Sequence, residues 1–479
     1  MSIKYNNYNT CNIIRIEEVE VNYAASFIID DEFYCEIDIQ SVERNCFDLI
    51  KDKPQVHIVV KFEQAYITFV NCQMSSYTFS HSEKEVDISI KFYSPLVLCD
   101  YEWNNSKDIC FTGFVTSITE ITELLGYFPY NESYSCMVAS DHNDLYGKNI
   151  FKKIGTEYSF FVIPNKTMGK NGVNVSIDSK IRYDSEKRFS ISELRELTDR
   201  ICLFYEILTG EVITLGESID LFDGDLFVKA IGLCNYPKTE LNIFKTPNDD
   251  RSYLRKRLFK ISDFDDIHNS ILAFDDLYKT CLLAFEAYKQ VLLDEEVRIG
   301  TYNKFLKLMQ IVEGYQRDIV NDEEQKRFND IKNSILEKLE DDEKTFIEKY
   351  TNNNGQEFGR CLKDFTINSL QILGFSKTKA KSHSNDLIRD MINDRDVYTH
   401  ASKIKNPVIS VDKLMQINYL YKTFFRISVL RNIGMSNEII KKRLLHDRRL
   451  VILIKNIFHL DFNRFDEFYD TGEFDRMMW

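Results

Sequence analysis

Residues 395–400 of the chain read Arg-Asp-Val-Tyr-Thr-His and end a segment, Asn385 to about His400, that is predicted to be an amphipathic helix. A guanidinium stays charged and can hold a phosphate through two parallel hydrogen bonds, whereas an imidazole titrates near neutral pH and can transfer a proton. Arg395 and His400 are therefore a candidate pair for phosphodiester cleavage. The spacing leaves another interpretation open, in which both are ordinary polar residues at a helix C-terminus, where positive charge is favourable.

Helical patterns surround this stretch. From Ser262 onward the apolar residues recur at helical spacing, which predicts an all-α bundle. The further predicted helices cover about 271–288, 305–315, 322–350, 358–373, 410–434 and 436–458. The helix over 322–350 is highly charged and has only a thin apolar stripe, so we expect it to pack shallowly.

The front half of the chain has strand patterns. Segments such as Val56–Phe62, Ala65–Val70 and Val86–Phe92 are rich in β-branched and aromatic residues and partly alternate. Their short intervals predict a β-rich, sandwich-like domain or a barrel. One helix, over 190–210, interrupts the strands, with a capping box at its start and a glycine at its end.

The fold class is therefore α+β and multidomain. A polar stretch with prolines over 235–257 separates a β-rich N-terminal domain, 1–245, from an all-α domain, 258–479, that we expect to fold and dimerise by itself. Residues 1–250 carry 23 Lys and Arg against 39 Asp and Glu, a net charge of −16 in a chain whose total is −14. Because an acidic surface repels nucleic acid, any chemistry on nucleic acid is expected in the back half.

The composition also limits cofactors and location. The 479 residues contain no run of about 18 uncharged apolar residues and no apolar segment after Met1, which predicts a soluble, cytoplasmic protein without membrane attachment. The 11 cysteines form no Cys-x-x-Cys pair and no cluster with histidines at zinc spacing. We therefore expect reduced thiols, mostly in the core, and neither a metal nor a cofactor.

A helical bundle with the pattern Arg-[Asn/Asp]-x-x-x-His near the end of one helix, followed by a connector and a long helix over 411–433, resembles the HEPN domain of prokaryotic toxins and defence nucleases. The acidic β-rich region in front, and the run Phe-Leu-Lys-Leu-Met-Gln-Ile-Val-Glu-Gly-Tyr at 305–315, make the chain similar to ApeA-type abortive phage exclusion proteins. The helical resemblance covers about residues 300–435.

The resemblance implies a metal-independent ribonuclease. RNA carries its own nucleophile, the 2′-hydroxyl, which attacks the adjacent phosphate when a base removes its proton and a cation stabilises the developing charge. His400 is the candidate general base or acid, and Arg395 the candidate phosphate ligand. The products would be a 2′,3′-cyclic phosphate and a 5′-hydroxyl, and DNA would resist cleavage because it lacks the nucleophile.

Three further residues are candidates around this pair. The resemblance suggests that Asp396 orients the arginine or the histidine, and that Glu313, on an earlier helix, pairs with Arg395. Tyr398 is a candidate for stacking on a base. From the residues alone, solvated side chains at the two acidic positions and a core aromatic at 398 remain alternatives.

On a straight helix, Arg395 and His400 lie about 140° apart around the axis. Either the helix ends or bends between them, or each residue acts with its counterpart from a second chain. The resemblance implies the second arrangement, a homodimer whose two motifs meet.

Basic residues flank the pair and are candidate RNA-backbone contacts: Arg389, Lys403 and Lys405, followed by a group on the last predicted helix. The expected partners are an RNA substrate, with tRNA as one candidate, a second copy of the chain, and a phage-derived trigger on the N-terminal domain. The predicted function is an abortive-infection ribonuclease. The alternative is a non-catalytic scaffold, in which a β-sandwich binds a ligand and the helices only dimerise.

Overall fold

The structure, a computed structural model, describes residues 7–17, 19–29, 35–81, 86–103, 109–118, 130–133, 136–139, 148–153, 156–169, 172–213, 215–232, 259–296, 300–319, 323–344, 358–400, 407–445 and 447–460. These residues form two compact units. Unit 1 holds the described parts of 7–202 and 213–232, and unit 2 holds 203–212 and the described parts of 259–460.

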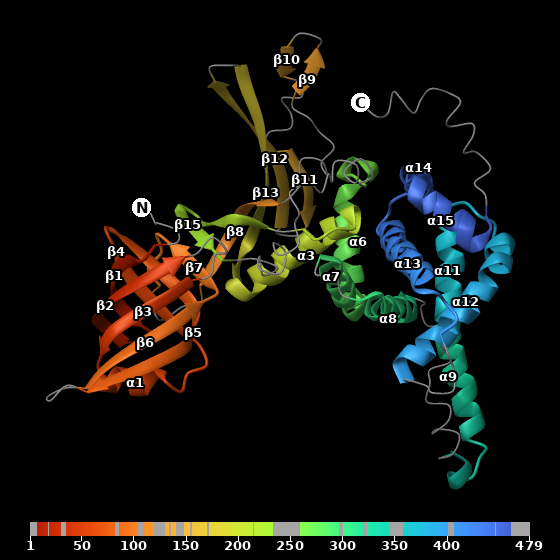
Figure 1. The fold of residues 1–479 in the computed structure, drawn as a ribbon, viewed down its shortest axis with the longest axis horizontal. Helices are drawn as coiled ribbons and strands as arrows, with labels where there is room; N and C mark the ends of the chain where they lie inside the picture. The colour runs from red at the N-terminus through yellow and green to blue at the C-terminus, as the bar shows by residue number, and fades with distance from the viewer. Residues whose placement is uncertain are drawn as a thin grey trace. The chain divides into compact units, whose positions relative to one another are not determined.

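Six strands of unit 1 close into an antiparallel barrel (Figure 1). They are β1 (Asn9–Ile16), β2 (Val19–Ile29), β3 (Cys35–Val42), β4 (Val56–Phe62), β5 (Ala65–His81) and β6 (Val86–Ser94). They pair in the order β5-β4-β1-β2-β3-β6, and β6 pairs with β5 again, which closes the ring. The predicted β-rich domain is confirmed, and of the two arrangements that the sequence left open this part takes the barrel.

The length of β5 makes this closure possible. The first half of its 17 residues pairs with β4 and β7 (Leu96–Cys99), and the second half pairs with β6. Pro95, which cannot donate to a ladder, separates β6 from β7. Beyond β7 the sheet continues through β15 (Leu226–Ile231), β14 (Leu215–Asp223), β8 (Cys110–Ile118), β13 (Gly172–Ser190), β12 (Thr156–Gly169) and β11 (Lys148–Lys153), while β9 (Tyr130–Ser133) and β10 (Cys136–Ala139) pair with each other.

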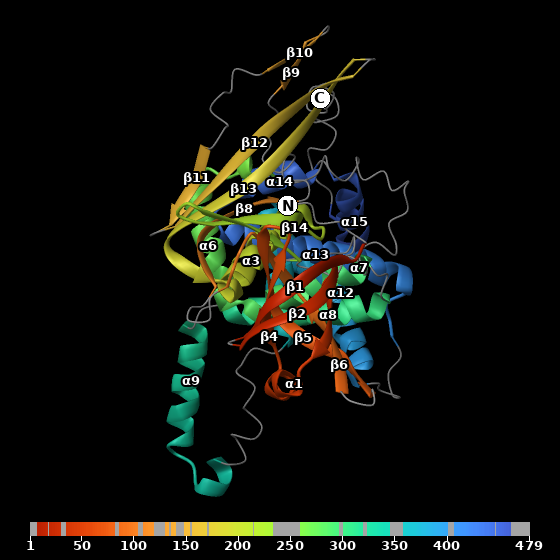
Figure 2. The same cartoon turned by 90° about the vertical axis from the view of Figure 1, so that its left-hand side faces the viewer.

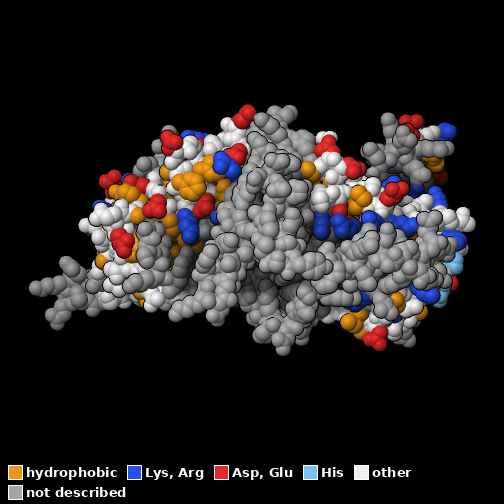
Figure 3. Space-filling view, turned by 90° about the horizontal axis from the view of Figure 1, so that it is seen from above, with side chains coloured by type: hydrophobic (Ala, Val, Ile, Leu, Met, Phe, Trp, Pro, Cys, Tyr) orange, Lys and Arg blue, Asp and Glu red, His pale blue; other side chains and the backbone are white. Residues whose placement is uncertain are grey.

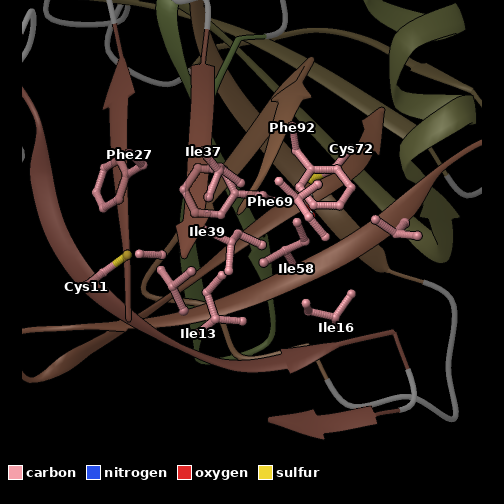
Figure 4. Close-up of a cluster of buried hydrophobic side chains, with 14 of the residues drawn as sticks. Cys11, Ile13, Ile16, Phe27, Ile37, Ile39, Ile58, Phe69, Cys72 and Phe92 are labelled. Atoms are coloured by element: carbon pink, nitrogen blue, oxygen red, sulfur yellow. The ribbon is translucent and has the colours of Figure 1, made fainter. Parts of the chain in front are cut away.

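Alternate side chains of the barrel strands fill its interior. Ile13, Ile37 and Phe69 are wholly buried, and the Phe27 ring meets the Phe69 ring edge-on at a centroid distance of 5.4 Å. Figure 4 shows these side chains converging from different strands. The short helix α1 (Arg44–Ile50) adds three buried side chains to the same core.

Unit 2 is all-α, as predicted. Its helices are η2 (Ile261–Asp263), α6 (Ile267–Thr280), α7 (Leu282–Glu296), α8 (Thr301–Ile319), α9 (Glu323–Leu336), α11 (Phe358–Ile372), α12 (Lys377–His400), α13 (Val411–Asn432), α14 (Asn437–Leu445) and α15 (Arg448–Phe458). α13 is the central helix, because it packs against α8, α11, α14 and α15 and buries residues on nearly all sides.

Several helix boundaries differ from the prediction. The first long helix is interrupted at Cys281, which leaves α6 and α7 as separate helices. α12 begins at Lys377, eight residues earlier than expected, because the Ser376 hydroxyl caps its first turn. The last helix is split at Asp447, whose carboxylate accepts from the amide of Leu450 and so starts a new helix.

The charged helix α9 packs shallowly, as its thin stripe predicted. Ile331 and Ile335 are 52% and 47% exposed. Figures 1 and 2 both show α9 extending away from the other helices of unit 2. It ends at Leu336 and is therefore shorter than the predicted 322–350.

Helix α3 (Ile191–Thr209) begins in unit 1 and ends in unit 2. The predicted capping box is present, since the Ser190 amide donates to the Glu193 carboxylate at 2.7 Å and the Glu193 amide donates to the Ser190 hydroxyl at 3.3 Å. Gly210 ends the helix with a φ of +76°, as expected for a C′ glycine. From residue 203 onward, however, the helix belongs to the helical unit.

Two cations of α13 hold this end of α3. Arg426 Nε donates to the carbonyl of Ile207 at 2.8 Å, and a second guanidinium nitrogen donates to the carbonyl of Leu208. Lys422, which is 8% exposed, donates to the carbonyl of Gly210 at 3.2 Å. Positive side chains thus meet the unpaired carbonyls at the negative end of the helix dipole.

One segment of the front half is therefore an exception to the predicted division into two domains. Residues 203–212 lie inside the helical unit, although 213–232 return to the sheet. A fragment of residues 258–479 would lack the carbonyls that Lys422 and Arg426 hold. The sequence did not show this, since a capped amphipathic helix between strands has the same pattern whichever core it joins.

We predict that Arg426→Ala lowers the free energy of unfolding by about 1–3 kcal/mol, because it leaves two helix-end carbonyls without their donors. Arg431→Ala is the matched control: Arg431 lies on the same helix but is exposed, so its removal should change stability by less than about 0.5 kcal/mol. Urea denaturation followed by circular dichroism measures both. Equal stability of the two variants would show that the contact to α3 contributes nothing.

Candidate active site

Helix α12 presents the Arg-His stretch in its last two turns. A stripe of its buried residues, spaced four and three apart, faces the bundle and consists of Ala380, Ser384, Leu387, Met391 and Asp394; Ile388 and Val397 are buried beside it. A wholly buried aspartate thus occupies a position where the stripe demands an apolar side chain. Such a residue must find hydrogen-bond donors inside the protein.

Asp394 finds them in the segment that leads into α13. One carboxylate oxygen accepts from the amide of Val408 at 2.7 Å, and the other accepts from the amide of Ile409 at 3.0 Å. A charge-assisted pair of this kind is about twice as strong as a neutral hydrogen bond. Asp394 therefore fixes the end of α12 to the start of α13. Asp394 was not predicted from the sequence, although a charged side chain on an apolar helix stripe indicates a buried, hydrogen-bonded residue.

Arg395, the next residue, is held by three side chains. One terminal nitrogen lies 3.4 Å from the Glu313 carboxylate of α8, and the other lies 3.5 Å from that of Asp396. Its central carbon lies 4.8 Å from the ring centroid of Phe358, the first residue of α11. The expected pairing of Glu313 with Arg395 is present, whereas Phe358 was not anticipated from the sequence.

This arrangement leaves the guanidinium accessible. The Arg395 side chain is 27% exposed and that of Glu313 is 30% exposed, so water screens their attraction and an anionic ligand can compete for the same nitrogens. Two carboxylates and an aromatic face limit the rotation of a long side chain that would otherwise sample many rotamers. The geometry suits a guanidinium that is oriented before a phosphate binds.

Tyr398 packs inside the bundle and does not face solvent as a free ring. Its ring lies 4.6 Å from that of Tyr302 and 6.3 Å from that of Phe305, both on α8. Its hydroxyl oxygen is buried, and burial together with the neighbouring Tyr302 raises its pKa well above the ordinary value. Tyr398 is thus half-buried against α8, and stacking on a base stays a prediction for it.

The remaining predicted site residues are placed only in part. His400 is the last residue of α12, so helical structure continues through the stretch, but its side chain lies outside the described residues. Lys403 and Lys405 also lie outside them. Arg389 is 74% exposed and pairs with Asp386 at 3.2 Å, which leaves it on the surface.

Two basic residues of the last predicted helix make contacts within the protein. Arg443 forms a two-pronged ion pair with the nearly buried Asp263, and the Arg449 guanidinium lies over the Tyr419 ring at 4.4 Å. These two residues have structural roles. On the face seen in Figure 3, Lys and Arg side chains of unit 2 nevertheless gather in a band.

No three His, Cys, Asp or Glu residues of the described part of the chain are placed to hold a metal ion. Eight of the cysteines there are buried, and burial raises the pKa of thiols such as Cys72 and Cys99 to about 12, so they stay protonated. Within the same residues, no helix combines the length and apolarity needed to cross a membrane.

Comparison with known protein families gives two matches. Residues 14–274 match the family model described as ApeA N-terminal domain 1, and residues 306–439 match the one described as Apea-like HEPN. The first match covers more than half of the chain, and the second contains Glu313 and the whole stretch 395–400. Neither a curated protein nor a solved structure matches the chain.

We predict that Asp394→Ala destabilises unit 2 by about 1–3 kcal/mol, because the buried amide of Ile409 and the partly buried amide of Val408 lose their acceptor. The control is Asp386→Ala on the same helix, whose side chain is 86% exposed and whose loss should have little effect. Urea denaturation gives the energies, and amide hydrogen exchange shows where they act. Unchanged exchange at Val408 and Ile409 in the first variant would contradict the role of Asp394.

Proposed function

The chain belongs to the ApeA family of abortive-infection proteins, which carry a HEPN domain, and we propose that it is an endoribonuclease that cleaves RNA without a metal ion. The observation that carries the proposal is the accessible Arg395 guanidinium, oriented by Glu313, Asp396 and Phe358 on the helix that ends at His400. A preoriented cation and a histidine that both reach the same phosphate are the minimum that cleavage by the 2′-hydroxyl needs.

In the proposed reaction, His400 accepts the proton of the 2′-hydroxyl. The 2′-oxygen then forms a bond to the adjacent phosphorus while the bond from phosphorus to the 5′-oxygen breaks. A protonated histidine donates to the departing 5′-oxygen, and Arg395 compensates the additional negative charge on the phosphate oxygens. Asp396 and Glu313 act as positioning residues for the guanidinium in this account.

Two chains supply the site in this proposal. Because α12 is helical up to His400, no end of the helix separates the two residues, and they lie about 140° apart around its axis. The segment that Asp394 holds exposes the side chain of Val408, and the first turns of α13 expose those of Val411 and Met415. The neighbouring Asp412 and Lys413 carry opposite charges, which suits a two-fold contact with a second copy.

Unit 1 has the role of a sensor in this proposal. Its half of the chain carries a net charge of −16, which disfavours RNA and suits control over a nuclease that would otherwise damage its own cell. A phage-derived component is the proposed trigger, and tRNA is one candidate substrate. Arg389, Lys403 and Lys405 are the proposed contacts to the RNA backbone.

We predict that Arg395→Ala and His400→Ala each reduce RNA cleavage by at least about 100-fold, because each removes a group that acts on the reacting phosphate. His383→Ala, on the exposed surface of the same helix, is the control and should keep full activity. Cleavage should persist in EDTA. A folded His400→Ala protein that still cleaves RNA would support the alternative, a binding scaffold without catalysis.

We predict that a mixed dimer of one wild-type and one His400→Ala chain retains far less than half of the wild-type rate, because one phosphate needs residues from both chains. Two different affinity tags allow the mixed dimer to be purified, and cleavage of labelled RNA gives the rate. A rate close to half would show that each chain carries an independent site.

A further inference from the structure

Tyr302 is the exposed member of an aromatic group that starts at the candidate active site. It is the second residue of α8 and is 40% exposed, whereas Phe305, one turn later, is wholly buried. Its ring lies 4.6 Å from that of Tyr398, at an angle of 47°. Tyr398 in turn lies one helical turn beyond Arg395, about 4.5 Å along the axis of α12. The group therefore links the guanidinium to an aromatic surface in solvent.

The burial of Tyr398 decides which ring can meet a ligand. Tyr398 is half-buried against Tyr302 and Phe305, and its hydroxyl is buried, so its ring offers less free surface than that of Tyr302. Tyr302 is supported by Tyr398 and has a large part of its surface in water. An exposed tyrosine that loses little entropy on contact is a suitable platform for a flat ligand.

The electrostatic potential at the start of α8 also favours the negatively charged backbone of RNA. Its first turn contains no acidic residue, and the amide nitrogens there form the positive end of the helix dipole. The side-chain amide of Asn418 donates to the carbonyl of Thr301 at 2.9 Å, which fixes this end of α8 to the central helix α13. The aromatic surface is therefore held in place relative to the bundle that carries Arg395.

We propose that Tyr302 is the stacking platform for an unpaired nucleobase of the nucleotide next to the phosphate that Arg395 binds. The inference rests on the proposed ribonuclease function and names the substrate form, single-stranded RNA. A base in a duplex has both faces covered by its neighbours, whereas an unpaired base can stack on a protein ring. The site thereby selects unpaired regions such as loops without reading a base sequence.

Binding of an RNA that cannot be cleaved tests the proposal. The full-length protein is titrated with a single-stranded oligonucleotide that carries 2′-O-methyl groups and one 2-aminopurine, whose fluorescence reports stacking. Tyr302→Ala should weaken binding by about 10- to 100-fold and remove the fluorescence change, since one stacked base contributes that much affinity. Tyr302→Phe should stay within about twofold of wild type because the ring is retained.

Two further variants keep the test decisive. Tyr302→Leu preserves an apolar contact to Tyr398 and should fold even if the alanine variant does not, yet it should show the same loss of binding. Tyr8→Ala, which removes an exposed tyrosine of unit 1, should bind as wild type does. Wild-type affinity of folded Tyr302→Leu for the RNA overturns the proposal. A Tyr302 variant that binds RNA normally but no longer dimerises also overturns it, because Tyr302 would then be a contact between two copies.

The outcome is separable from that of the proposed function. If Arg395→Ala and His400→Ala abolish cleavage while the Tyr302 variants bind normally, the ribonuclease stands and the stacking platform fails. If the Tyr302 variants lose binding while His400→Ala still cleaves, the platform stands and the catalytic assignment fails.

Discussion

The helical unit and its candidate site depend on the two hydrogen bonds that the Asp394 carboxylate accepts. A charge with no exposure is stable in a protein interior only when donors satisfy it, and here the amides of Val408 and Ile409 do so. The bond fixes where α12 ends relative to α13. Since Arg395 is the adjacent residue, the same bond fixes the backbone from which the guanidinium extends.

The central helix α13 extends this constraint to the rest of the chain. Its first turn follows the segment held by Asp394, and further along it Lys422 and Arg426 hold the end of α3. α3 is inserted between strands of the β-rich unit, directly after β13 and before β14. The front half of the chain thus contributes a structural part to the bundle.

The sequence predicted the features that arise from local patterns. The strands of the barrel, the helices of the bundle and the capping box of α3 are all present. The pairing of Glu313 with Arg395, which joins residues 82 apart, is also present, but the family resemblance implied it and no local pattern did. Other features that arise between distant residues were not predicted. The closure of the barrel depends on β5 pairing with two partners along its length, and the place of Phe358 beside Arg395 depends on how α11 packs against α12. The contact of Tyr398 with Tyr302 and Phe305 likewise depends on how α8 packs against α12.

The central claim is that the RNA supplies its own nucleophile at a site built from Arg395 and His400. The chemical ends of the cleaved RNA test it most directly. Purified protein is incubated with a defined RNA, and the fragments are analysed by mass spectrometry. The account predicts a 2′,3′-cyclic phosphate on one fragment, a 5′-hydroxyl on the other, and no cleavage when the nucleotide before the cleaved bond is a 2′-deoxynucleotide. Fragments with a 3′-hydroxyl and a 5′-phosphate, or cleavage of the deoxy-substituted RNA at the same bond, would contradict it.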